Sequence, residues 1–116
     1  MLATGGYLAG STSQLEPYHS LSYWNYTPVG LAKLALDADL VPVEIRPGID
    51  SLALITRRLV PRGQRSERVF ARWWGRQSPL NRVIDVYARV LRLDTATVNA
   101  TKLLFAGQFA FLCRAA

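Results

Sequence analysis

The alternation of two β-tolerant segments with one helical segment in residues 6–48 most constrains the fold. Residues 6–13 combine small and β-tolerant side chains and fade into polar residues, which is typical of a strand. Thr27 and Pro28 then supply an N-cap hydroxyl and a proline at the first helical position. A second short strand, 41–46, is ended by a Pro-Gly pair. Strand, helix and strand in this order predict a parallel crossover in an α/β sheet.

Asp39 lies where the first helix should end. Glycine is favoured at such a position because the residue often adopts a left-handed conformation, and aspartate is among the few others that tolerate it. Asp50 or Ser51 can then cap a second helix, whose apolar residues are Leu52, Ile55 and Leu59.

The rest of the chain is predicted to be helical up to a last strand. Ser78 and Pro79 repeat the cap-plus-proline start of a helix. One apolar stripe then follows the helix to near Asp94, formed by Leu80, Val83, Ile84, Tyr87 and Leu91. Residues 102–113 are apolar at both odd and even positions, which predicts a strand buried on both faces.

Composition indicates a small folded domain. The chain has 116 residues, 50% of them hydrophobic and 19% charged, which is enough for one core but not for two. Its single cysteine, Cys113, gives no disulfide framework and no metal-ligand spacing. No stretch resembles a targeting signal or a membrane span. We therefore expect a cytoplasmic protein without a transmembrane segment.

The formal net charge of +6 comes mainly from arginine. Eight arginines fall in residues 57–82, beside Trp73 and Trp74. They are interpreted either as a solvated helical face whose stems cover apolar surface or as a nucleic-acid-binding surface. No nucleic-acid-binding motif accompanies them, so nucleic acid is the less favoured partner. Basic amphipathic helices also suit membrane surfaces and acidic partners.

The segment from Leu15 to Pro28 contains four aromatic residues and the only histidine of the chain. It joins the predicted first strand to the first helix, and such loops are where open α/β sheets gather their ligands. His19 could act as a general base, and Glu16 could orient it or hold a substrate donor. Packing of the aromatic side chains against the sheet is the alternative interpretation.

The order of these motifs resembles the carboxyl-terminal half of a class I S-adenosylmethionine-dependent methyltransferase, of the group called methyltransferase type 11. The similarity covers GGYLAGSTSQLEPYHSLSYWNYTPVGLAKLALDADLVPVEIRPG and the final LLFAGQFAFLC. It comprises a Gly-Gly turn before a strand, a loop with histidine and aromatics, and a Thr-Pro helix start. A strand similar to VPVEIRPG closes the unit, and Asp39 replaces the glycine usual before that strand.

The resemblance implies a partial Rossmann-like methyltransferase sheet of about three strands, the last of them antiparallel, with a helical insertion. Residues 1–59 would form the carboxyl-terminal part of the core, 60–95 a basic helical insertion, and 96–116 the final strand. The loop would border the pocket of a small-molecule substrate, with His19 as the catalytic residue. Its substrate-binding residues would be Glu16, Tyr18, Tyr23 and Tyr26.

S-adenosylmethionine is the cofactor that the resemblance implies, but the glycine-rich turn that would hold it is absent from the sequence. We therefore expect a fragment that is inactive alone. If the last strand runs between the other two, strand 6–13 keeps an open edge, which predicts self-association or a partner chain. A basic nucleic-acid-binding module and an inert protein-interaction module are the alternative functions.

Overall fold

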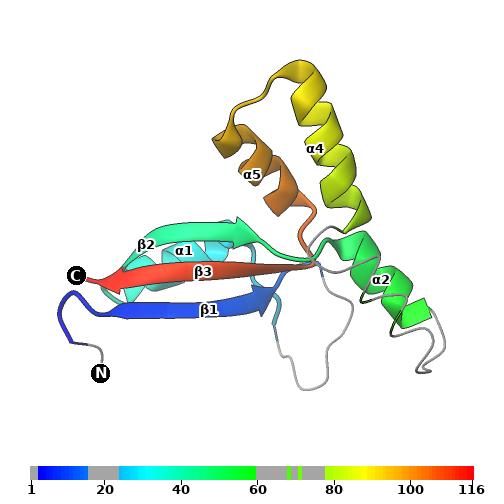
Figure 1. The fold of residues 1–116 in the computed structure, drawn as a ribbon. Helices are drawn as coiled ribbons and strands as arrows, with labels where there is room; N and C mark the ends of the chain where they lie inside the picture. Colours follow the sequence, from blue (N-terminus) through cyan, green and yellow to red (C-terminus); the bar gives the residue numbers. More distant parts are fainter. Residues whose placement is uncertain (1–2, 16–23, 60–67, 69–70, 72–77) are drawn as a thin grey trace.

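The computed structural model describes residues 3–15, 24–59, 68, 71 and 78–116. These form a three-stranded sheet and four helices (Figure 1). The elements follow in the order β1 (Tyr7–Ser13), α1 (Pro28–Asp37), β2 (Leu40–Pro47), α2 (Ser51–Leu59), α4 (Pro79–Leu91), α5 (Thr95–Leu104) and β3 (Gln108–Ala115). The α/β class is therefore confirmed.

The sheet has the order β1-β3-β2, and β3 runs antiparallel to both neighbours. Tyr7 pairs with Arg114 and Ser13 with Gln108, while Leu40 pairs with Ala115 across the other ladder. Because β3 opposes both, β1 and β2 are parallel to each other, as predicted, but are not neighbours. The last strand is also antiparallel and central, as expected.

Helix α1 begins and ends as its sequence predicts. The Thr27 hydroxyl accepts a hydrogen bond from the Gly30 N–H at 3.0 Å, with Pro28 in the first turn. Asp39 adopts the left-handed conformation, with φ 57°. The helix packs against β2 and buries Ala35. Its position behind the sheet in Figure 1 leaves the opposite sheet face uncovered by the described residues.

The prediction of a strand over 102–113 is wrong at its start. Residues 95–104 form helix α5, and β3 starts only at Gln108. Asp94 determines this difference because its side chain caps α5, accepting from the Thr97 N–H. The segment 96–116, assigned to the final strand, therefore opens with a helix.

β3 is not buried on both faces. Phe109 and Cys113 are buried, whereas Ala110 and Arg114, which point to the other face, are exposed. The exposed residues lie on the face that no described helix covers. The apolar sequence of β3 therefore occurs in a sheet that is covered on one face only.

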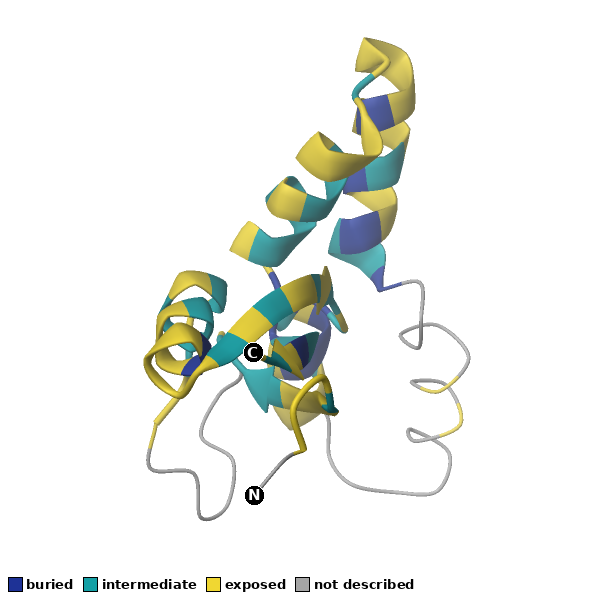
Figure 2. Cartoon of the chain, turned by 90° about the vertical axis from the view of Figure 1, so that its left-hand side faces the viewer, coloured by how far each residue is buried: buried dark blue, intermediate teal, exposed yellow. Residues whose placement is uncertain are grey.

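The apolar stripe predicted for α2 is exposed, and the one predicted for α4 is only partly buried. In α2 the buried residues are Ala53 and Leu54, and the predicted stripe residues Leu52, Ile55 and Leu59 are exposed. In α4 the buried residues are Asn81, Ile84 and Ala88, so Val83, Tyr87 and Leu91 remain exposed. Figure 2 shows α4 and α5 rising away from the sheet with buried positions on α4 and exposed positions on both helices.

Candidate functional site

The segment from Leu15 to Pro28, called the aromatic loop below, starts and ends near the carboxyl end of β1. The Gln14 N–H donates to the Gly107 carbonyl at 2.8 Å, and the Tyr26 N–H donates to the Ser13 carbonyl at 2.9 Å. Tyr26 is half-buried there, while Trp24 is exposed. Four of the predicted site residues, Glu16, Tyr18, His19 and Tyr23, lie outside the described residues. Only the position of Tyr26 is thus given by the structure.

Gln14 is a residue at this loop that sequence analysis missed. Its side-chain oxygen, Oε1, is buried and has no hydrogen-bond partner among the described residues. A buried acceptor without a donor is uncommon in native proteins, because its lost hydration is not compensated. Gln14 immediately follows β1, and this polar residue at the strand end was the available sequence signal. Its side chain is therefore a candidate to accept a hydrogen bond from a ligand at this end of the sheet.

β1 hydrogen-bonds to the rest of the sheet along one side only. The Ala115 N–H donates to the Gly6 carbonyl, and the Gln14 N–H to the Gly107 carbonyl. In an antiparallel ladder the bonded positions alternate. With this register, the N–H and C=O groups of Tyr7, Ala9 and Ser11 point away from β3. Among the described residues no strand lies on that side.

The opposite edge of the sheet, on β2, is protected. Pro42 and Pro47 have no N–H to offer, and both pair with β3 at positions whose backbone nitrogen faces outward. The outward Ile45 carbonyl accepts a hydrogen bond from the Asn99 side chain at 3.1 Å. Prolines and a covering helix are devices that block strand pairing at an edge. β1 contains no proline and no charged residue, and no described helix covers its outer edge, so among the described residues it is the edge open to a further strand.

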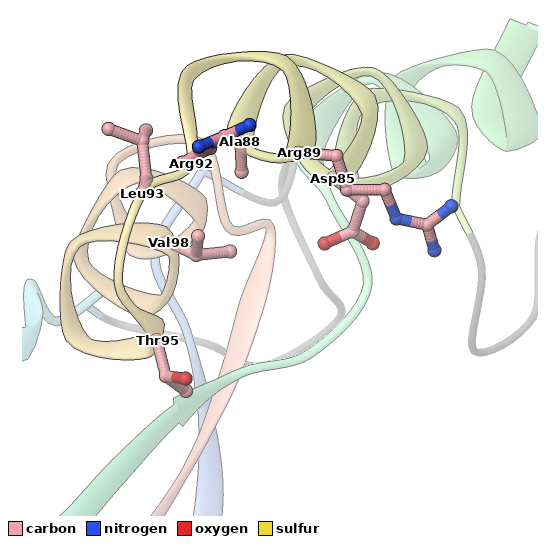
Figure 3. A pocket seen from close by; sticks show the side chains of 7 residues that line it. All are labelled: Asp85, Ala88, Arg89, Arg92, Leu93, Thr95 and Val98. Atoms are coloured by element: carbon pink, nitrogen blue, oxygen red, sulfur yellow. The ribbon is translucent and has the colours of Figure 1, made fainter.

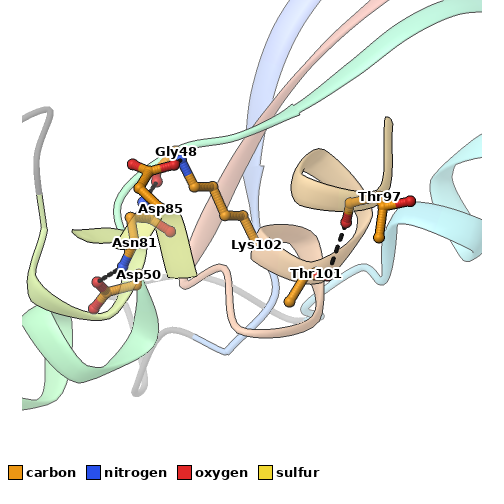
Figure 4. A network of polar contacts seen from close by, with 7 residues as sticks. All are labelled: Gly48, Asp50, Asn81, Asp85, Thr97, Thr101 and Lys102. Atoms are coloured by element: carbon orange, nitrogen blue, oxygen red, sulfur yellow. Dashed lines mark hydrogen bonds and ion pairs between the residues drawn. The ribbon is translucent and has the colours of Figure 1, made fainter. Parts of the chain in front are cut away.

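A second polar cluster is centred on Asp50, which is fully buried (Figure 4). Its Oδ1 accepts from the Ala53 N–H at 2.8 Å, in the first turn of α2. Its Oδ2 accepts from the N–H groups of Leu80 at 2.8 Å and Asn81 at 3.2 Å, in the first turn of α4. One carboxylate therefore caps two helices, and the positive ends of both helix dipoles favour its charge.

This arrangement corrects the predicted role of Ser78. Its hydroxyl makes no capping hydrogen bond to α4 and instead accepts from the Asp50 N–H at 3.2 Å. The Asn81 side chain donates to the Gly48 carbonyl at 3.0 Å, while its buried Oδ1 has no partner in the part of the chain that the structure describes. The cluster holds the end of β2 to both helices, and every Asp50 contact is internal. Its geometry is that of a structural centre.

α4 and α5 are joined by an ion pair and enclose a shallow pocket. Lys102 Nζ lies 2.6 Å from Asp85 Oδ1, and the two residues face each other in Figure 4. The pocket, of about 270 Å³, lies at the turn between the two helices (Figure 3). It is lined by Asp85, Ala88, Arg89, Arg92, Leu93, Thr95 and Val98. Its lining thus combines two arginines with the Asp85 carboxylate and does not carry a single sign of charge.

Within the part of the chain that the structure describes, no cluster of three or more histidine, cysteine or carboxylate side chains could hold a metal ion. None of the helices described there is long and apolar enough to cross a membrane. Asp37 and Asp85 each form an ion pair with a lysine, Lys33 and Lys102 respectively.

No protein-family model matches the chain, and no significant match was found among curated proteins or solved structures.

Proposed function

We propose that this chain is the carboxyl-terminal part of a class I S-adenosylmethionine-dependent methyltransferase and supplies one wall of its substrate pocket. The observation that carries the proposal is the sheet itself: two parallel strands flank a central antiparallel strand, and β1 is open at its outer edge. The unpaired N–H and C=O groups along the outer edge of β1 could hydrogen-bond to a further strand. In this proposal the cofactor-binding strands lie beyond β1.

The residues present do not fit S-adenosylmethionine. The described glycines are used for packing and turns: Gly10 lies under the Phe111 ring, and Gly107 packs against the Asp50 backbone. Gly48 follows β2 and precedes α2, but it is a single glycine packed against the Gln108 carbonyl, and no described glycines form the glycine-rich turn that cradles a nucleotide-like cofactor. The chain alone should therefore not bind the cofactor, and we assign no reaction step to it in isolation.

The substrate wall would be the carboxyl end of β1 and the loop that follows. Tyr26 would contribute an aromatic surface and Gln14 a hydrogen-bond acceptor. The loop residues Glu16, Tyr18, His19 and Tyr23 keep the roles proposed from the sequence, with His19 as general base. A small-molecule substrate and a cytoplasmic location belong to the same proposal.

The test uses the DNA immediately upstream of the Met1 codon. We expect an in-frame extension, or an adjacent reading frame, that encodes a strand followed by a glycine-rich turn. The chain produced together with that polypeptide should bind S-adenosylmethionine in calorimetry, whereas the chain alone should not. Binding by the chain alone, or no binding by the assembly, would contradict the proposal.

A catalytically inert interaction module is the second candidate, because the open edge of β1 serves strand pairing whether or not chemistry follows. A distinct polypeptide that co-purifies with the chain and pairs through β1 without binding S-adenosylmethionine would favour this candidate. The complex with that polypeptide should not form in an Ala9→Pro variant, since that change removes an outward N–H of β1.

A further inference from the structure

α4 exposes an apolar stripe formed by Val83, Val86, Tyr87 and Val90, the α4 stripe. Their exposed fractions are 63%, 60%, 57% and 74%. Their spacing places them on one face of the helix, opposite the face that buries Ile84 and Ala88. A helix in water normally places its apolar residues against the core and polar residues outside. The outer face of α4 therefore has the composition of a contact surface.

Positive charge borders the α4 stripe. Arg82 and Arg89 are seven residues apart and occupy the sector of the helix next to Val86. The one acidic residue of α4, Asp85, forms an ion pair with Lys102 and so adds little negative charge. Arg89 also lines the α4–α5 pocket together with Arg92 and Thr95 (Figure 3). The pocket also contains Ala88, so it lies on the buried side of α4, whereas the stripe lies on the other side.

This charge disfavours a second copy of the chain as the occupant. Packing two α4 stripes together, in either direction, would bring the arginines of one copy to the border of the other. Each chain also carries a net charge of +6, which adds to the repulsion. An anionic partner meets the same arginines with attraction.

The neighbouring helix α2 repeats the pattern. It exposes Leu59, has Arg57 and Arg58 in its last turn, and contains no acidic residue. Exposed apolar side chains beside arginines thus occur on two helices that diverge from each other (Figure 1). A groove on a protein partner would bind one of these helices, whereas the surface of an anionic lipid bilayer could bind both.

We propose that the α4 stripe docks onto the surface of an anionic phospholipid bilayer. The valines and Tyr87 enter the boundary between headgroups and acyl chains, and Arg82 and Arg89 lie at the phosphate level. This surface is separate from the β1 edge, so the inference does not rest on the proposed methyltransferase function.

The test is co-sedimentation of the full chain with vesicles. We expect binding to phosphatidylcholine vesicles that contain roughly 30 mol % phosphatidylserine, and at least about tenfold weaker binding to phosphatidylcholine alone. Because arginines elsewhere in the chain are attracted by charge alone, the decisive variants are Val86→Asp and Val90→Asp. Each should weaken binding about tenfold, since a negative charge replaces a valine side chain that docking would bury in the bilayer.

The matched control is Val29→Asp, which introduces the same charge at an 80% exposed valine of α1. It should weaken binding far less than the α4 variants. Val90→Ser, with circular dichroism to establish folding, gives a second variant if the aspartates unfold the helix. Equal losses in Val29→Asp and Val90→Asp, or binding that is independent of phosphatidylserine, would overturn the proposal. Stripe-dependent capture of a protein without vesicle binding would also overturn it.

Discussion

At the scale of single residues, the carboxylate of Asp50 accepts three backbone N–H groups that start two different helices. Sequence analysis named Asp50 as one of two possible caps for α2, because an aspartate before a helical pattern indicates a cap. It could not assign the same side chain to α4, since the two contacts span about thirty positions of sequence. That pairing is a tertiary property.

Replacement of Asp50 by alanine should lower the free energy of unfolding by about 3 kcal/mol, because it leaves three N–H groups near the core without an acceptor. Asp50→Asn keeps one acceptor oxygen and should cost about half as much. Urea denaturation followed by circular dichroism measures both. The control is Asp37→Ala, which removes an exposed ion pair to Lys33 and should change stability little. Equal effects at the two sites would contradict the structural role of Asp50.

Asp94 gives the chain a pH-dependent contribution to stability. The hydrogen bonds from the Thr97 N–H and hydroxyl hold the pKa of its carboxyl below the ordinary value of 3.8. A folded pKa that is lowered means that the stabilisation is complete above 3.8 and is lost as the pH falls through the lower folded value. Melting temperatures of wild type and Asp94→Asn, measured from pH 7 to pH 2.5, should therefore converge at the acid end. A constant difference over the whole range would contradict this.

At the scale of elements, the two edges of the sheet differ because of a few side chains. β2 has two prolines and the Asn99 hydrogen bond at its outer edge, whereas β1 has no proline and no charged residue. The sequence predicted both strands and the antiparallel central position of the third. It did not predict helix α5. The apolar residues of 102–113 suggested a strand, and Asp94 was placed at the end of the preceding helix and was not recognised as the N-cap of a new one.

The edge assignment predicts opposite results for two neighbouring proline substitutions. Ala9→Pro removes an N–H that points away from the sheet, so the fold should persist while pairing of further strands is blocked. Gly10→Pro removes an N–H that bonds to β3 and should destabilise the sheet by about 3 kcal/mol or more. Circular dichroism reports the fold, and light scattering reports association. The same destabilisation by both variants would show that β1 is bonded on both sides.

At the scale of the whole molecule, an uncharged open edge is carried by a chain with a net charge of +6. Pairing of strands favours association, whereas long-range repulsion between like-charged chains opposes it. We therefore expect the isolated chain to self-associate, and to do so more strongly when salt screens the repulsion. Binding to anionic vesicles should change in the opposite direction with salt. Light scattering between 50 mM and 500 mM NaCl tests this, and a monodisperse monomer throughout would contradict it.

The candidate site shows the same division between sequence and structure. The sequence located the loop after β1, and the structure places the loop's two ends at one end of the strand, with Tyr26 beside Ser13. Gln14 was not predicted: its place at the end of β1 was a signal in the sequence, but only the structure shows that its side-chain oxygen is buried with no partner among the described residues. The roles of His19 and its neighbours in the loop stay predictions.

Local chemistry determined what could be inferred from the sequence alone. Thr27 with Pro28 started a helix, Asp39 ended it in a left-handed conformation, and a Pro-Gly pair ended β2, because these preferences act between residues a few positions apart. Only the tertiary structure decided which apolar residues are buried. Burial depends on what packs against each face: α4 buries Ile84 and Ala88, whereas Val86 and Val90 stay exposed. Only the tertiary structure, likewise, made β1 an open edge and joined two helices through Asp50.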